Sequence, residues 1–302
     1  MKYVFILFLT LSFNGVTFAQ NFEGISNING VDLYIKTLGN GNPIIFLHGG
    51  PGLNHSYFLP QVSGLAKDHK LIFFDQRASG RSAMVQDSTF MTLDKMTEDI
   101  EEIRKTFANE KIIIIAHSWG GLLAMKYAMK YPNNLRSLIL VSSVSPKAHE
   151  YESETAATVK SRMTREDSVA RAAVLASEGF KAGKGEAYEK LLKLAFKTTF
   201  HDKALVDNLN LAIDDNFANK RRALFMLSNE LSNYDLYPGL RSIKVPVLII
   251  HGESDATPKA LSQSIASTIS NSNLVIMKNA GHFPFVEQPE AFTKVILEFT
   301  RR

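Results

Sequence analysis

The chain has 302 residues, of which 45% are hydrophobic and 21% are charged, and its formal charge at pH 7 is +4. This length can bury a large core as one α/β domain carrying an insertion, and it does not require two full domains. The positive charges are spread along the chain without basic blocks, which argues against a nucleic-acid partner. Cysteine is absent, which excludes a disulfide framework, a cysteine nucleophile and thiolate-bound zinc.

The N-terminus predicts an exported protein. Met1 and Lys2 are followed by a continuous apolar run, and small residues stand at Thr17 and Ala19. This pattern is typical of a secretory signal peptide, so residues 1–19 are expected to be removed and the mature protein to be periplasmic or secreted. A membrane span needs about 20 apolar residues, so no stable membrane anchor is expected. An uncleaved anchor and an N-terminal core strand are the alternatives.

Buried strands alternate with helices along most of the remaining chain. Strands are predicted within residues 31–39, 42–50, 70–74, 111–118, 135–143, 245–255 and 273–282. Helices are predicted over residues 93–107, 120–130, 258–269 and 289–300. Near-continuous runs of Ile, Val and Leu between helices indicate a mostly parallel sheet covered on both faces, which is an α/β fold.

The central part of the chain differs in pattern from the rest. Residues 146–242 contain no convincing strand but several helical stretches, including 187–196 and 219–231. A turn is predicted at residues 181–186, between helices. The chain is therefore divided into a core, residues 20–145 and 243–302, and a helical lid, residues 146–242, over one end of the sheet.

Polar clusters follow the predicted strands, where open parallel sheets bind their ligands. These clusters are residues 48–52, 75–82, 116–121, 251–255 and 280–283. Among them, "AHSWGG" lies between a strand and a helix and resembles the nucleophile elbow G-x-S-x-G, with Ala116 in place of the first glycine and Ser118 as the nucleophile. The alternative is a serine that only caps the helix.

Two further residues favour the catalytic interpretation of Ser118. A serine hydroxyl needs a histidine to accept its proton, and the histidine needs an acid. Asp255 and His282 follow the last two strands, in the chain order Ser, acid, His that such sites use. We therefore predict the triad Ser118, Asp255 and His282. His117, beside the serine, is not expected to be the base.

The oxyanion of an acyl-transfer reaction needs two N–H donors. The backbone of Trp119, directly after the nucleophile and at the start of a helix, is expected to supply one. Gly50, in the glycine-rich loop after the strand "IIFL", is expected to supply the other. His48 is expected to support this loop by hydrogen bonding.

The motifs "HGGPG", "DQRASGRS" and "AHSWGG" resemble the α/β-hydrolase superfamily, and within it the proline iminopeptidase-like branch of serine peptidases. The matching segments span residues 43–142 and 245–300. The resemblance implies the α/β-hydrolase fold, with the same triad and the same oxyanion donors as above. It also implies a structural role for "DQRASGRS", with Asp75 and Arg77 paired near the site.

The resemblance implies an aminopeptidase that releases N-terminal proline or another small residue. Such an enzyme must hold a protonated amine, and Glu230 with Tyr234 in the lid is the candidate acceptor; a solvated helix end is the alternative. A carboxylesterase, amidase or lactonase is the alternative within the serine hydrolases. A ligand-binding protein without catalysis is the alternative from another class. The expected partner is a small molecule or short peptide, and no spacing implies a metal or an organic cofactor.

Overall fold

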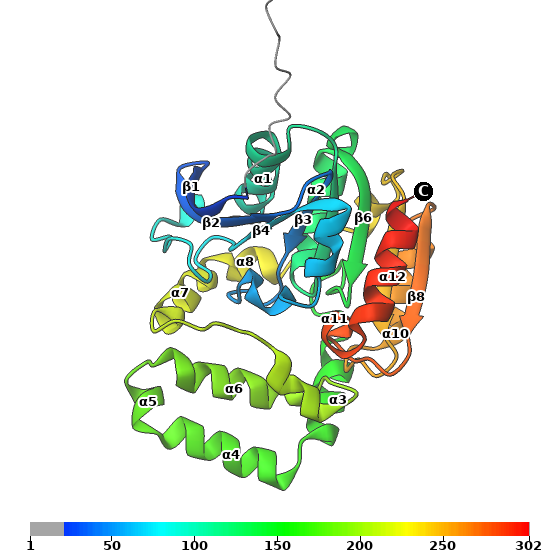
Figure 1. The fold of residues 1–302 in the computed structure, drawn as a ribbon. Helices are drawn as coiled ribbons and strands as arrows, with labels where there is room; N and C mark the ends of the chain where they lie inside the picture. Colours follow the sequence, from blue (N-terminus) through cyan, green and yellow to red (C-terminus); the bar gives the residue numbers. More distant parts are fainter. Residues whose placement is uncertain (1–20, 302) are drawn as a thin grey trace, which may run out of the picture.

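The computed structural model describes residues 21–301, so the predicted signal peptide lies outside the described residues. Its centre is an eight-stranded sheet in the order β1-β2-β4-β3-β5-β6-β7-β8 (Figure 1). The strands are β1 Glu23–Ile28, β2 Val31–Leu38, β3 Asn42–Leu47, β4 His69–Phe74, β5 Ile112–His117, β6 Leu135–Val141, β7 Val247–Gly252 and β8 Ser272–Met277. Strands β3 to β8 are mutually parallel, and β2 is antiparallel to both of its neighbours.

Both faces of the sheet are buried, which explains the apolar runs in its strands. In β3, Ile45 and Leu47 face one hydrophobic core, and Ile44 and Phe46 face the other. The helices that follow β4, β5 and β7 contribute to the first core. The helices that follow β8 and three 3-10 helices, His55–Phe58, Ser63–Lys67 and Lys203–Asn208, contribute to the second. Successive apolar residues of a strand therefore all pack in one of the two cores.

The helices of the core agree with the apolar spacing of the sequence. Their bounds are α1 Leu93–Ile103, α2 Gly120–Lys130, α10 Lys259–Thr268, α11 Pro284–Glu287 and α12 Pro289–Thr300. Helix α1 begins where the side chain of Thr92 accepts a hydrogen bond from the backbone N–H of Lys95. No helix in residues 21–301 has the length and apolar character that a membrane crossing needs.

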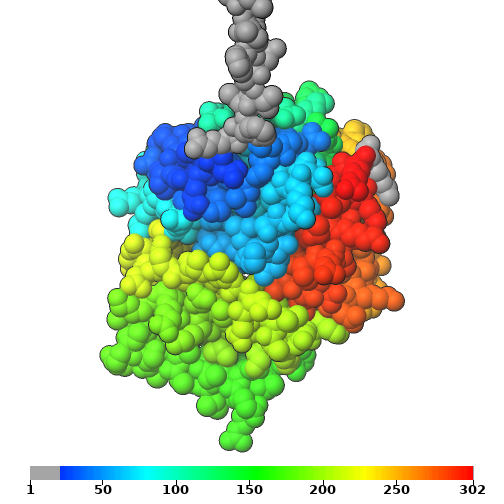
Figure 2. Space-filling model, viewed as in Figure 1, coloured from blue at the N-terminus to red at the C-terminus, as the bar shows by residue number. Residues whose placement is uncertain are grey.

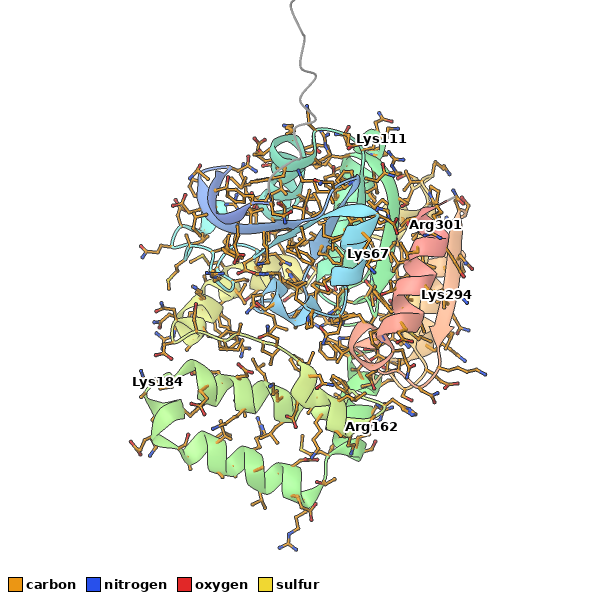
Figure 3. All side chains as sticks on the ribbon, in the orientation of Figure 1. Lys67, Lys111, Arg162, Lys184, Lys294 and Arg301 are labelled. Atoms are coloured by element: carbon orange, nitrogen blue, oxygen red, sulfur yellow. The ribbon has the colours of Figure 1, made fainter. Side chains whose placement is uncertain are left out.

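The helices between β6 and β7 lie mostly beyond the carboxyl ends of the parallel strands (Figure 1), and the last of them places the buried Leu240 in the first core. They are α3 Glu152–Arg162, α4 Arg165–Ala176, α5 Glu178–Lys181, α6 Gly185–Lys197, α7 Phe217–Ala223, α8 Ser228–Leu231 and α9 Tyr237–Leu240. In Figure 2 the green helices of this lid lie against the core through the yellow-green segment that follows them. The labelled basic side chains in Figure 3 are spread over core and lid, with Arg162 and Lys184 on the lid.

The two ends of the lid are joined to each other by backbone contacts. Lys147 and Asp235 form an isolated antiparallel bridge. The N–H of Ala148 donates to the carbonyl of Tyr234 at 2.9 Å, and the N–H of Leu236 donates to the carbonyl of Pro146 at 2.8 Å. We call these contacts the neck of the lid.

Two features of the fold were not predicted. Strand β1 pairs only with β2 at the edge of the sheet, and its sequence "EGISNI" lacks a regular apolar alternation. The predicted helix 219–231 is instead α7, a 3-10 turn at Leu224–Leu227, and α8. This turn lies where Leu224 packs over the loop containing Gly52.

Candidate active site

Ser118 lies in a sharp turn between β5 and α2, as predicted. Its φ of 52° is in the left-handed region, which is uncommon for a residue with a side chain. Gly120 is required in this turn because a Cβ there would overlap the carbonyl oxygens of Leu47 and His48. Ala116, at the other small position, is fully buried. The turn thus holds the serine hydroxyl at the carboxyl end of the central strand.

The structure brings the three residues of the predicted triad together from three strand ends. His282 Nε2 is 3.1 Å from Ser118 Oγ. His282 Nδ1 is 3.0 Å from Asp255 Oδ2 and 3.1 Å from Oδ1. Asp255 Oδ1 also accepts a hydrogen bond of 3.0 Å from the backbone N–H of Thr257. This arrangement can take a proton from the serine and stabilise the imidazolium that results.

For both His282 and Asp255, burial and the neighbouring charge shift the pKa in opposite directions. Burial disfavours the charged form of His282, but the carboxylate of Asp255 outweighs it and raises the pKa of His282 above its ordinary value of 6.5. Burial likewise opposes ionisation of Asp255, but His282 outweighs it and lowers the pKa of Asp255 to about 2. Asp255 therefore stays ionised at neutral pH and can orient the histidine.

The N–H groups of the two predicted oxyanion donors are free in the part of the chain that the structure describes. Neither the backbone N–H of Gly50 nor that of Trp119 has an acceptor among residues 21–301. Gly50 has a φ of 128°, a conformation that favours glycine. Trp119 stands at the N-terminus of α2, where unpaired N–H groups and the helix dipole favour negative charge.

His48 supports the loop that carries Gly50, as predicted. The backbone N–H of Gln76 donates to His48 Nε2 at 3.0 Å, and the Gln76 side-chain amide donates to the His48 carbonyl at 2.7 Å. The indole N–H of Trp119 donates to Gln76 Oε1 at 2.9 Å. Gln76 therefore links the nucleophile turn to the glycine-rich loop, a role that its sequence position did not indicate.

Asp75 and Arg77 are not paired with each other, which corrects the expectation for "DQRASGRS". Asp75 Oδ1 is 2.7 Å from His55 Nδ1, and its other oxygen accepts from the backbone of Arg81. Arg77 instead makes two hydrogen bonds of 2.5 and 2.6 Å to the carboxylate of Asp99 on α1. The two side chains have separate partners because Asp75 directly follows β4, whereas Arg77 lies in the turn after it, within reach of Asp99 on α1.

Glu230 and Tyr234 are held by different parts of the molecule. Both carboxylate oxygens of Glu230 lie 3.3 Å from the backbone nitrogen of Leu93, at the N-terminus of α1. In the described part of the chain, no hydrogen bond joins Glu230 to a triad residue. The Tyr234 hydroxyl donates to the carbonyl of Ser145 at 3.2 Å.

Tyr234 shares a cavity of about 330 Å³ with two acids that sequence reasoning did not single out, Glu150 and Glu152. Glu150 Oε2 accepts hydrogen bonds from the hydroxyls of Ser145 and Tyr237. The cavity wall includes Val144, whose N–H donates to the Ser118 carbonyl, and Thr257, which binds Asp255. No local sequence pattern indicates this grouping, because the neck brings the two ends of the lid together.

Comparison with known proteins agrees with this fold and identifies the family. Residues 42–289 match the family described as alpha/beta hydrolase fold. The chain is 30% identical over 293 residues to a proline iminopeptidase of Saccharolobus solfataricus, which covers 92% of this chain and 91% of the relative. It is 28% identical over 273 residues to a proline iminopeptidase of Heyndrickxia coagulans, covering 86% and 91%. An α/β fold family hydrolase from Bacillus anthracis superposes with a TM-score of 0.71 at 19% identity, covering 92% of this chain and 99% of that structure.

Proposed function

The chain belongs to the α/β-hydrolase fold family, and from this premise we propose that it is a serine hydrolase acting as an aminopeptidase that releases N-terminal proline or another small residue. The assignment as a serine hydrolase rests on the unbroken series of hydrogen bonds from Ser118 through His282 to Asp255. The aminopeptidase is supported by the curated relatives, which bear the name proline iminopeptidase and match the chain over most of their length.

The proposed reaction is acyl transfer in two steps. Ser118 Oγ attacks the carbonyl carbon while His282 Nε2 takes its proton, and the N–H groups of Gly50 and Trp119 donate to the oxyanion. Collapse of the tetrahedral intermediate breaks the C–N bond, and His282 gives its proton to the leaving amine. Water then attacks the ester on Ser118 with His282 again as the base, which releases the acid and restores the enzyme.

An aminopeptidase must also recognise the protonated N-terminal amine, and Glu150 joins Glu230 as a candidate acceptor. Glu150 Oε1 has no hydrogen-bond partner in the described residues, whereas both oxygens of Glu230 face the N–H of Leu93. A charge-assisted hydrogen bond contributes about 1.5–3 kcal/mol. Glu150→Gln should therefore raise KM for proline β-naphthylamide about 10- to 100-fold and leave p-nitrophenyl acetate hydrolysis unchanged. Glu230→Gln is the matched control, and the reverse result would make Glu230 the acceptor.

The hydrolase is tested by covalent labelling. A fluorophosphonate probe should label the wild-type protein at neutral pH and should not label Ser118→Ala. Folded wild-type protein that resists the probe would exclude a serine hydrolase and favour a ligand-binding protein.

The aminopeptidase is tested by comparing substrates. The enzyme should hydrolyse proline β-naphthylamide, and acylation of the free amine of this substrate should abolish turnover. Equal rates with free and blocked amines would reject an aminopeptidase. If p-nitrophenyl esters or lactones are hydrolysed while aminoacyl amides are not, the enzyme is an esterase or lactonase.

We further propose that the protein is exported to the periplasm or secreted. The support is the positive start, the apolar run and the small residues Thr17 and Ala19. Expression with its own N-terminus, followed by fractionation and N-terminal sequencing, should yield a soluble exported protein that begins at Gln20. Full-length protein in the cytoplasm would contradict export.

A further inference from the structure

A buried chain of hydrogen bonds connects the glycine-rich loop to the backbone of His282. The N–H of Gly49 donates to the hydroxyl of Tyr57. That hydroxyl is 2.9 Å from His117 Nδ1, and His117 Nε2 is 2.8 Å from the carbonyl oxygen of His282. Tyr57 and His117 are both almost completely buried, so water does not replace these bonds.

The two ends of this chain determine where each proton lies. A backbone N–H can only donate and a carbonyl can only accept, so His117 carries its proton on Nε2 and accepts from Tyr57 at Nδ1. Burial, followed by the neighbouring His282, lowers the pKa of His117 well below its ordinary value, and burial raises the pKa of Tyr57. Tyr57 and His117 therefore both stay neutral, and each hydrogen bond between Gly49 and the His282 carbonyl has only one possible donor.

The two ends of this hydrogen-bond chain lie next to two parts of the proposed catalytic site. Gly49 precedes Gly50, whose N–H is a proposed oxyanion donor, and a Cβ on Gly49 would lie 3.1 Å from Ser118 Cβ. The His282 carbonyl belongs to the residue whose ring faces Ser118 Oγ at 3.1 Å. A shift of either end would change the distance between the attacking oxygen, its base and the oxyanion donor.

We propose that Tyr57 and His117 are positioning residues that hold the oxyanion loop and the base His282 in fixed register for acyl transfer. This inference rests on the proposed function, because it assigns no chemistry of its own. It also gives His117, which stands beside the nucleophile in the sequence, a task other than proton transfer. The alternative is that the chain only satisfies buried polar groups and contributes to stability.

Phenylalanine substitutions separate these two roles. Tyr57→Phe removes the central hydroxyl, and Tyr127→Phe is the matched control, because the buried hydroxyl of Tyr127 donates to Glu101 at 2.8 Å outside the site. A misplacement of about 1 Å can cost 10²-fold in rate. Tyr57→Phe should therefore lower kcat for p-nitrophenyl acetate about 10- to 100-fold with KM unchanged, while Tyr127→Phe leaves kcat unchanged.

A transition-state analogue provides a second readout. Phenylboronic acid forms a tetrahedral adduct with a catalytic serine, so its inhibition constant should rise in Tyr57→Phe by the same factor by which kcat falls. Urea unfolding of both tyrosine variants measures the loss of stability separately. If Tyr57→Phe keeps kcat within twofold of Tyr127→Phe, the positioning role is overturned.

A His117 pair keeps the inference testable should Tyr57→Phe fail to fold. His117→Gln retains one donor and one acceptor, whereas His117→Phe retains neither. The Gln variant should recover most of the kcat that the Phe variant loses, and equal kcat in the two variants would overturn the inference. Wild-type protein that neither hydrolyses the ester nor reacts with a fluorophosphonate would instead overturn the proposed function, and this inference with it.

Discussion

The central strand of the core and the helices α3 and α4 of the lid differ in how much of their surface is buried. Ile114 and its neighbours in the central strand are completely buried between two layers of helices. Helix α3 of the lid has no buried residue, and Asp167 is the one buried residue of α4. Ion pairs such as Lys197 with Asp167 at 2.7 Å and Lys184 with Asp215 at 2.9 Å contribute contacts within the lid.

The proposed enzyme needs a catalytic site and a site that recognises the substrate amine, and these two sites lie in differently packed regions. The triad and the oxyanion donors lie on strand ends and on a helix start, where packing fixes distances to a fraction of an ångström. The carboxylates that are candidates for substrate recognition lie in the lid, whose surface contacts are weaker. We therefore expect changes in the core to affect chemistry and stability strongly, and changes in the exposed helices α3 and α4 of the lid to act locally.

The largest expected effect is on the chemical step. Ser118→Ala should lower kcat about 10⁶-fold, because the remaining triad residues cannot act without the nucleophile. Its urea midpoint should stay close to that of the wild type. A residual rate within 100-fold of wild type would contradict the assignment of Ser118 as the nucleophile.

The next largest effect is expected for Asp255→Asn, which should lower kcat about 10⁴-fold. In the wild type, His282 must be neutral to accept a proton, and its pKa is raised above 6.5. The kcat/KM profile should therefore rise with pH through a midpoint above 6.5. The midpoint should move to lower pH in Asp255→Asn, because the carboxylate that stabilises the imidazolium is gone. An unchanged midpoint would contradict the assignment of Asp255.

A matched pair of alanine substitutions tests the difference in packing directly. Ile114→Ala in the fully buried strand should lower the free energy of unfolding by about 2–5 kcal/mol. Val169→Ala on α4, where the side chain is 62% exposed, should change it by about 0.5 kcal/mol or less. Urea unfolding measures both values. Similar losses at the two sites would show that the lid is as tightly packed as the core.

A smaller effect than that of Ile114→Ala is expected at the start of α4. Asp167 accepts hydrogen bonds from the N–H of Thr164 and from Lys197, and Lys197, followed by Thr164, lowers its pKa to about 2. The stabilisation is present above the ordinary pKa of 3.8 and is lost as the pH falls towards 2. Asp167→Asn should cost about 1 kcal/mol, seen as faster hydrogen exchange confined to α4.

Asp207→Asn is the control for this local effect, because no hydrogen bond of the Asp207 side chain is found in the part of the chain that the structure describes. Faster exchange across the whole protein in Asp167→Asn would contradict a purely local role.

Much of the core was predictable from the sequence because its signals are local. Isoleucine runs indicate strands buried on both faces, and "AHSWGG" indicates the turn that holds Ser118. Parallel strands place their carboxyl ends at one edge, so the chain order alone predicted that Asp255 and His282 would approach Ser118. The edge strand β1 was missed because its exposed residues need no apolar alternation.

The remaining features depend on contacts between distant residues. Glu150 meets Tyr237 across 87 positions, and Tyr57 meets His117 across 60. Arg77 was expected beside Asp75, but the α1 helix places Asp99 within its reach. Such pairs follow from the angle between elements, which composition and periodicity do not specify.

The neck of the lid has a consequence for how such proteins can be rebuilt. Because Lys147 and Asp235 meet in a backbone bridge, the lid leaves and re-enters the core at nearly one point. The sheet is then insensitive to the length of chain between these residues, since the entropy of closing a loop grows only slowly with its length. A lid of another size, joined at residues 147 and 235, would still need to supply two contacts to the core: the carbonyl of Thr199, which accepts a hydrogen bond from the N–H of His282, and the ring of Phe200, which stacks on Phe283.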